Sequence, residues 1–581
     1  MKITSGLKNG LTAYGDSEFS LFLRKAFIKA LGYSDDALDR PIIGITNTFS
    51  DYNPCHGNVP QLIDAVKRGV MFAGGLPMVF PTISIHESFA HPTSMYLRNL
   101  MSMDTEEMVR AQPMDALVVI GGCDKTLPAQ MMAAASVDLP TIVIPTGPMS
   151  VGHHRGELLG ACTDCRRVWS TYRAGLIDKE EVQIINDRLV ASVGTCTVMG
   201  TASTMACVCE AMGFTLPFGA TIPATHSERL RFAENSGRCA CNLAVNGPRP
   251  SELLSLAAFK NAMVVLQALG GSTNAIIHLA AIAGRMGRRF DLEQLDEIGR
   301  KVPVLVDLKP TGSHYMPHFH DAGGMPGLLS RLAGHLSLDA KTVSGSTLGE
   351  IIDGASCDSK IIRPIDEPVS AEGSIAVLFG NLAPRGAIIK QSAATESLMN
   401  HTGRAVVFES VEHLTKMIDD PDLEVGPHDI LVLRGAGPVG GPGMSEAGYL
   451  PIPKKLAHAG VKDMIRISDA RMSGTAFGTI VLHVTPEAAA GGPLALVATG
   501  DHIKLDVCNR RIDLLVEDGE LQKRKKAISL LPERPQRGYA KLFADSVLQA
   551  DDGCDFDFLT GSRKTSSEQF PVVPLRQSSS S

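Results

Sequence analysis

Three cysteines stand in segments unlike those that usually surround a buried thiol. Cys55 lies in SDYNPCHGN, Cys123 in GGCDK and Cys196 in GTCTVMGTAST. A free cysteine is most often a small buried hydrophobic residue. Neighbouring Gly, Pro, Asn and Asp residues weaken that interpretation, because they form turns rather than core positions. The three residues are therefore candidates for metal-binding or reactive thiols.

Carboxylates form a second set of candidates. Asp124 and Lys125 follow Cys123 directly, Glu87 lies in SIHESFA, and Glu446 lies in the glycine-rich GGPGMSEAG. Oxygen ligands in such loops suit a hard cation such as Mg²⁺. Spacing alone favours solvated loop charges or helix caps, so the metal-site interpretation needs further support.

A serine in a glycine-bounded turn is the third candidate. Ser473 and Thr475 lie in SDARMSGTAFG, after a predicted strand at 464–467. Such a serine can act as a nucleophile or base. The segment lacks the GxSxG pattern and has no evident partner histidine. An ordinary turn serine is an equally good interpretation.

Alternating strands and helices position the first two sets. Continuous apolar runs predict strands at 42–46, 115–120 and 141–144, and apolar spacing predicts helices at 17–31, 59–73, 179–192, 199–212 and 273–284. This order favours a parallel sheet covered by helices on both faces. Cys123 and Cys196 then lie where strands end and helices begin, which is where such folds bind ligands.

The composition changes near residues 360–375, and short β-like runs follow. They lie at 375–379, 405–408, 430–433, 480–484 and 512–516, separated by Gly and Pro. We therefore predict the α/β class with two domains. An α/β domain spans 1–370, and a β-rich, barrel-like domain that carries Glu446 and Ser473 spans 371–575. The polar tail after residue 560 is expected to be frayed.

Composition limits the classes of partner. Of 581 residues, 44% are hydrophobic and 20% charged, as in a globular protein, and the formal charge is −7. With no basic excess and only 5% aromatic residues, neither nucleic acid nor an anionic membrane is an expected partner. The start MKITSGLKNG has no signal-peptide pattern and no apolar run approaches membrane length, so a cytoplasmic location is expected. There, twelve cysteines are not expected to form disulfides.

Three further patterns suggest other chemistry. Gly435 to Gly440 matches GxGxxG after a strand, with Asp469 after a second strand, but the prolines that follow leave little room for a crossover helix. Four cysteines suggest zinc, although the second pair is too closely spaced for a zinc knuckle: Cys162, Cys165, Cys239 and Cys241. Three histidines in a proline-containing loop favour a polar surface or pocket lining over a metal site: His314, His318 and His320.

Five motifs together resemble the dihydroxy-acid dehydratase / 6-phosphogluconate dehydratase family. They are NPCHGN, GGCDKTLPAQ, GTCTVMGTASTMA, GPGMSEAG and SDARMSGTAFG, and they occur in the family's order from about residue 41 to beyond 478. The branch that acts on branched-chain precursors tends to read TDGRFSGG where this chain reads SDARMSGT. The sequence is therefore more similar to the sugar-acid branch, which includes L-arabinonate and D-xylonate dehydratases.

The resemblance implies a role for each candidate. Cys55, Cys123 and Cys196 would hold a 2Fe-2S cluster, whose missing fourth thiolate leaves one iron open for Lewis-acid work. Glu87, Asp124 and Glu446 would bind Mg²⁺, with a carbamylated Lys125 as a further ligand. Ser473 would be the base that takes the C2 proton, and Thr475 a supporting hydroxyl. The product would be a 2-keto-3-deoxy acid, and a homodimer or homotetramer is expected.

Competing hypotheses concern the substrate of the enzyme or the class of protein. The same chemistry on 2,3-dihydroxy-3-methylbutanoate would serve amino-acid synthesis. A nicotinamide oxidoreductase would use the 435–440 glycines, and a non-catalytic iron–sulfur or zinc module would use the cysteines alone. The sequence does not determine which aldonate would be dehydrated, because pocket side chains read sugar stereochemistry.

Overall fold

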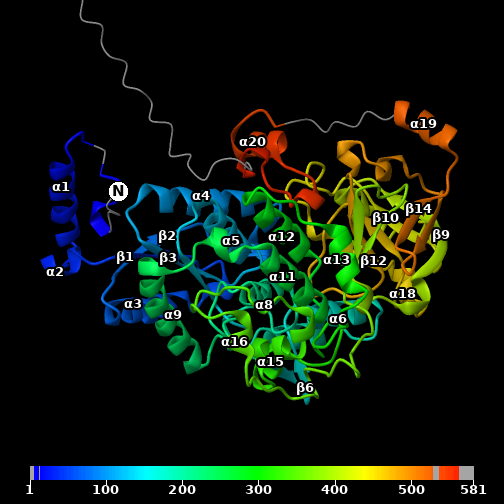
Figure 1. Ribbon diagram of the computed structural model, residues 1–581. Coiled ribbons are helices and arrows are strands. Elements are labelled where there is room, and N and C mark those ends of the chain that lie inside the picture. Colours follow the sequence, from blue (N-terminus) through cyan, green and yellow to red (C-terminus); the bar gives the residue numbers. More distant parts are fainter. Residues whose placement is uncertain (1–5, 12–13, 528–534, 562–581) are drawn as a thin grey trace, which may run out of the picture.

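A computed structural model describes residues 6–11, 14–527 and 535–561 (Figure 1). The polar tail predicted to be frayed, and the predicted end of the second domain at 575, lie outside the described residues from 562 onward.

The first half of the chain is built on a parallel sheet of four strands in the order β2-β1-β3-β4. The strands are β1 (Ile42–Asn47), β2 (Leu76–Pro81), β3 (Ala116–Gly121) and β4 (Thr141–Pro145). Every residue of β3 and β4 is buried, which explains their unbroken apolar sequence. The α/β prediction for this half is confirmed.

Helices cover both faces of this sheet. In Figure 1, α3 and α9 lie on one side of the strands and α4 and α5 on the other. The helices of this half are α1 (Ser17–Lys29), α2 (Asp35–Leu38), α3 (Val59–Phe72), α4 (Arg98–Ala111), α5 (Thr126–Val137), α6 (Thr163–Arg173), α7 (Lys179–Leu189), α8 (Thr201–Ala211), α9 (Ser227–Asn246), α10 (Pro250–Leu253), α11 (Leu256–Ala268), α12 (Asn274–Arg285), α13 (Leu292–Gly299), α14 (Met316–Asp321), α15 (Gly324–Arg331) and α16 (Leu348–Ile352). A hairpin of β5 (Gly152–His154) and β6 (Glu157–Leu159) precedes α6.

The second half is an eight-stranded mixed sheet in the order β14-β13-β9-β10-β11-β12-β8-β7. The strands are β7 (Ala376–Leu378), β8 (Gly386–Ile389), β9 (Asn400–Phe408), β10 (Ile430–Leu433), β11 (Arg466–Ser468), β12 (Ile480–Thr485), β13 (His502–Asp506) and β14 (Arg511–Leu514). Its helices are α17 (Val411–Met417), α18 (Lys454–His458), α19 (Asp518–Ala527) and α20 (Gly538–Ser546).

The two edges of this second sheet nearly meet. Phe379, next to β7, pairs with Arg511 at the start of β14, and its N–H donates to Arg510 O at 2.9 Å. The predicted barrel-like half is therefore confirmed as a nearly closed sheet. The strands β8 and β13 were not predicted from the sequence.

The chain returns to its first half at the end of the described part. Arg285 of α12 forms a fully buried ion pair with Asp555, with Nε 2.6 Å from Oδ2. This contact holds the two halves together along one side. Among the described helices, none has both the length and the apolar character needed to cross a membrane.

Candidate active site between the two halves

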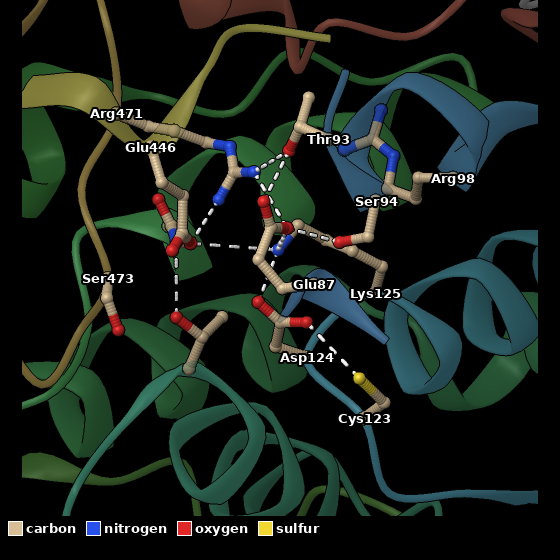
Figure 2. A network of polar contacts seen from close by, with 12 residues as sticks. Glu87, Thr93, Ser94, Arg98, Cys123, Asp124, Lys125, Glu446, Arg471 and Ser473 are labelled. Carbon is tan, nitrogen blue, oxygen red and sulfur yellow. Dashed lines mark hydrogen bonds and ion pairs between the residues drawn. The ribbon is translucent and has the colours of Figure 1, made fainter. Parts of the chain in front are cut away.

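Three carboxylates from three separate loops meet at the site. Glu87 begins the short turn Glu87–Phe89 after β2, Asp124 lies between β3 and α5, and Glu446 begins the turn Glu446–Tyr449 in the barrel half. One oxygen of each lies within 4.8 Å of the other two (Figure 2). Two of these loops follow parallel strands of the first sheet, where ligand sites of such sheets form.

Two buried cations compensate this negative charge. The Lys125 ammonium contacts Asp124 and lies 3.6 Å from Glu87 Oε2 and 4.0 Å from Glu446 Oε1. Arg471 forms ion pairs with Glu446 and with Glu87, whose Oε2 is 3.1 Å from Nη2. Both cationic side chains are completely buried. Lys125 was predicted from the sequence but Arg471 was not, although Arg471 stands inside the SDARMSG motif.

Glu87 is the most constrained of the carboxylates. Its Oε1 accepts a hydrogen bond from Thr93 Oγ1 at 2.6 Å, and Oε2 accepts one from Ser94. Burial alone would raise the pKa of Glu87, but the charges of Arg471 and Lys125 and these two hydroxyls hold it far below its usual range. Glu87 is therefore ionised at any physiological pH.

The thiols form two neighbouring pairs. The sulfur atoms of Cys55 and Cys123 and a ring nitrogen of His86 lie within 4.8 Å of one another. In the described part of the chain, Cys196 is not a member of that group; its sulfur lies 3.0 Å from that of Cys162. The hydrogen bond with Cys123 lowers the pKa of Cys55 to about 6. Both members of the second pair interact electrostatically with Cys55.

The thiols and the carboxylates adjoin each other. Cys123 Sγ lies 3.4 Å from Asp124 Oδ1, so the group of thiols and the group of carboxylates are in direct contact (Figure 2). The GGCD turn that creates this contact has no room for a side chain at Gly122. A Cβ at Gly122 would lie 1.6 Å from Thr146 Oγ1 and 3.0 Å from the Cys55 carbonyl oxygen. Glycine is therefore required for the loops of Cys55 and Cys123 to meet.

The imidazole of His56 supports the same turn through hydrogen bonds. Its Nε2 accepts hydrogen bonds from the N–H groups of Gly122 and Cys123, both at 3.0 Å, and its Nδ1 donates to Thr48 O at 2.7 Å. Burial lowers the pKa of His56 to about 4, which keeps the ring neutral and able to accept. Sequence reasoning missed this role, although His56 follows Cys55 directly.

Ser473 lies at the barrel side of the carboxylate network (Figure 2). Its Oγ is 2.8 Å from the Thr475 hydroxyl. The loops of Glu446 and Ser473 are hydrogen-bonded, since Gly448 N–H donates to Arg471 O at 3.0 Å. On its other side the Ser473 turn packs against the Cys196 loop: a Cβ at Gly474 would lie 3.0 Å from Thr201 N. The turn therefore touches the loops that carry both sets of ligand candidates.

A buried lysine supports this turn. Lys390 follows β8 and is 1% exposed, and its Nζ lies 3.4 Å from the Gly474 carbonyl oxygen. Burial lowers the pKa of Lys390 to about 7. No motif surrounds Lys390, so nothing in the sequence singled it out.

The three competing patterns do not form the sites they suggest. The N–H groups of Gly435 and Ala436 donate to Asp469, and those of Val439 and Gly440 donate to Glu487. These amides are thus not available to a dinucleotide phosphate. Cys239 and Cys241 bond to backbone carbonyls of residues 343 and 70, away from Cys162. Among described residues, the three histidines of 314–320 do not converge on one point; His320 alone joins another group.

Convergent thiols, carboxylates and a serine between two folded halves define an enzyme whose site is built from potential metal ligands. Residues 40–351 match the dihydroxy-acid/6-phosphogluconate dehydratase N-terminal domain, and residues 360–554 match the C-terminal domain. The chain therefore belongs to this family of dehydratases, which are hydro-lyases.

Relatives in the family include enzymes for different acids. The L-arabonate dehydratase of Azospirillum brasilense is 46% identical over 561 residues, covering 95% of this chain and 96% of that one. The 6-deoxy-6-sulfo-D-gluconate dehydratase of Pseudomonas putida is 46% identical over 529 residues, covering 90% and 91%. The dihydroxy-acid dehydratase of Carboxydothermus hydrogenoformans is 39% identical over 543 residues, covering 92% and 97%.

Proposed function

We propose that this dehydratase removes water from a sugar acid, an aldonate such as L-arabinonate or D-xylonate, to give its 2-keto-3-deoxy acid. The observation that carries the proposal is the 3.4 Å contact between Cys123 and Asp124, which places the group of thiols directly beside the group of carboxylates. A small hydroxy acid can reach both groups at once. Greater identity to sugar-acid dehydratases, 46% against 39%, supports an aldonate over a branched-chain precursor.

The carboxylate group fits Mg²⁺ by its chemistry. Glu87, Asp124 and Glu446 present oxygen atoms to one point, and the Lys125 ammonium, together with the Arg471 guanidinium, now supplies the positive charge there. Oxygen donors are what Mg²⁺ prefers. Carbamylation of Lys125 would replace this ammonium by a further anionic oxygen ligand, which makes room for the metal charge. These four side chains would hold the ion.

The thiols fit an iron–sulfur cluster by the same criterion. Thiolate sulfur suits iron, and Cys55, Cys123 and Cys196 approach from three different loops. The proximity of the Cys55 and Cys123 sulfur atoms, and the electrostatic interaction of Cys196 with Cys55, support one shared cluster-binding site. These three residues would hold a 2Fe-2S cluster.

The chain's own groups account for the proton transfer. When bound, the cluster supplies an open iron position as a Lewis acid for the leaving C3 hydroxyl, and Mg²⁺ supplies positive charge beside the substrate carboxylate. Ser473 Oγ, deprotonated to the alkoxide that a neighbouring positive charge favours, would take the C2 proton as the general base. Thr475 Oγ1, at 2.8 Å, would donate to this alkoxide, and Lys390 would fix the turn through Gly474 O. The enol product would then become the 2-keto acid.

A substrate panel tests this function. The purified, cluster-loaded protein is assayed without oxygen against C5 and C6 aldonates and against 2,3-dihydroxy-3-methylbutanoate, with detection of the 2-keto product. We expect turnover of at least one aldonate at a kcat/KM well above that for the branched acid. Preference for the branched acid would instead identify a dihydroxy-acid dehydratase, and turnover of neither class would reject both.

We also propose that the enzyme works as a homo-oligomer. Helix α1 exposes large apolar side chains that a second copy would cover: Phe19, Phe22 and Phe27. Light scattering after size-exclusion chromatography should give a multiple of the 61.8 kDa chain mass. A single-chain mass across a wide concentration range would contradict the proposal.

A further inference from the structure

A second group of metal-ligating side chains lies outside the site described above. His226 precedes α9, Glu228 stands in the first turn of α9, and His320 lies on α14. One ligand atom of each lies within 4.8 Å of the other two. The three residues come from segments almost one hundred positions apart, so only tertiary packing brings them together.

The separation of two of these atoms matches that of ligands on one ion. His320 Nε2 lies 3.4 Å from Glu228 Oε2. In a tetrahedral site with metal–ligand bonds of roughly 2.0–2.1 Å, neighbouring ligand atoms are about 3.3 Å apart. The imidazole of His226 lies edge-on to that of His320, with ring centroids 6.3 Å apart. Two histidines and one carboxylate leave a fourth position for water.

The second ring nitrogen of His320 has a hydrogen-bonding partner, as in many metal-bound histidines. The Thr221 hydroxyl lies 3.5 Å from Phe218 O, to which it donates, and 3.1 Å from His320 Nδ1. With a metal on Nε2, Nδ1–H would donate to the Thr221 hydroxyl, as the second ring nitrogen of a metal-bound histidine commonly does.

We propose that His226, Glu228 and His320 bind one divalent transition-metal ion of the Zn²⁺ type, separate from the proposed Mg²⁺ and iron–sulfur groups. The ion would tie the start of α9 to α14. Both segments contact the loop of Cys196: Met316 N–H donates to Thr197 O at 2.6 Å, and Ala224 N–H donates to Pro148 O, whose residue pairs with Thr195. The ion therefore stabilises the surroundings of Cys196 without touching substrate.

The test measures Zn²⁺ binding to the cluster-loaded protein with Mg²⁺ in excess, by equilibrium dialysis and elemental analysis. The wild type should bind one more Zn²⁺ per chain than His320→Ala or Glu228→Gln. The matched control His318→Ala, on the same helix, should bind as the wild type does. Iron content and the thermal midpoint without Zn²⁺ show that each variant is folded.

A milder variant tests the geometry. Thr221→Val keeps the shape but removes the partner of Nδ1, and should weaken Zn²⁺ affinity by roughly 10–100-fold, as loss of an outer hydrogen bond does in metal sites. Saturating Zn²⁺ should raise the thermal midpoint of the wild type but not of Glu228→Gln. Equal Zn²⁺ stoichiometry in the wild type and His320→Ala, or an equal loss in His318→Ala, overturns the proposal.

Discussion

The guanidinium of Arg471 lies 3.1 Å from the Glu87 carboxylate, although 384 positions separate the two residues in sequence. Glu87 belongs to the α/β half and Arg471 to the barrel half. The same guanidinium contacts Glu446, so one buried cation joins loops of both halves at the centre of the site (Figure 2).

Arg471 should therefore be needed for stability as well as activity. Arg471→Met leaves Glu87 and Glu446 without their nearest cation, and removing one partner of a buried ion pair costs about 3–5 kcal/mol. We expect a loss of that size in the free energy of unfolding of the metal-free protein, measured by denaturant titration. Arg471→Lys should recover only part, because an ammonium cannot bond to both carboxylates at once. A variant as stable as the wild type would contradict this role.

Iron content should depend on three of the five neighbouring cysteines. Alanine at Cys55, Cys123 or Cys196 should abolish the brown colour and the iron of the purified protein, because each removes a proposed cluster ligand. Cys162→Ala and Cys165→Ala should keep both, although Cys162 lies 3.0 Å from Cys196. Loss of iron in Cys162→Ala but not in Cys196→Ala would exchange their roles. A colourless, fully active wild type would reject the cluster.

Ser473→Ala should lower turnover without disturbing the fold or the cluster. The variant should keep its iron and its thermal midpoint, while kcat falls by ~10²–10⁴-fold, the usual contribution of a general base. Thr475→Val should lower kcat less, since Thr475 contacts Ser473 and not the reacting carbon. Near-normal turnover in Ser473→Ala would remove this residue as the base.

Divalent metal should be required for turnover. Anaerobic chelation should abolish activity, and Mg²⁺ or Mn²⁺ should restore it, with cluster absorbance showing that iron was retained. Glu446→Gln should need a higher Mg²⁺ concentration for half-maximal activity, because it replaces a charged oxygen ligand by a neutral one. Full activity of the chelated enzyme would refute the second metal site.

Lys390 should give the stability of the protein a distinct pH dependence. Its pKa falls from 10.5 to about 7 in the folded state, so between these values the unfolded chain binds more protons. This residue therefore makes the free energy of unfolding rise with pH from about 7 to about 10.5. Lys390→Met should be more stable than the wild type at pH 7, and the difference should shrink toward pH 10.

The matched control for this prediction is Lys260→Met, which changes an exposed lysine of α11. Unfolding curves at pH 7 and pH 10 should show no such convergence for the control. Turnover of Lys390→Met should fall, since Gly474 O loses its partner beside Ser473. A stability difference independent of pH would show that Lys390 does not titrate in this range.

The sequence by itself determined the ligand types, their order and most of the elements that carry them. Unbroken apolar runs located β3 and β4, and the glycine-rich motifs located Cys123 and Glu446, because local backbone requirements leave a local signature. Tertiary structure alone decided that Arg471 reaches Glu87, that Cys162 lies beside Cys196, and that Lys390 supports the Ser473 turn. The first contact depends on how the two halves pack together, and the other two join loops of one half that lie far apart in sequence. No periodicity within any of these segments encodes such contacts.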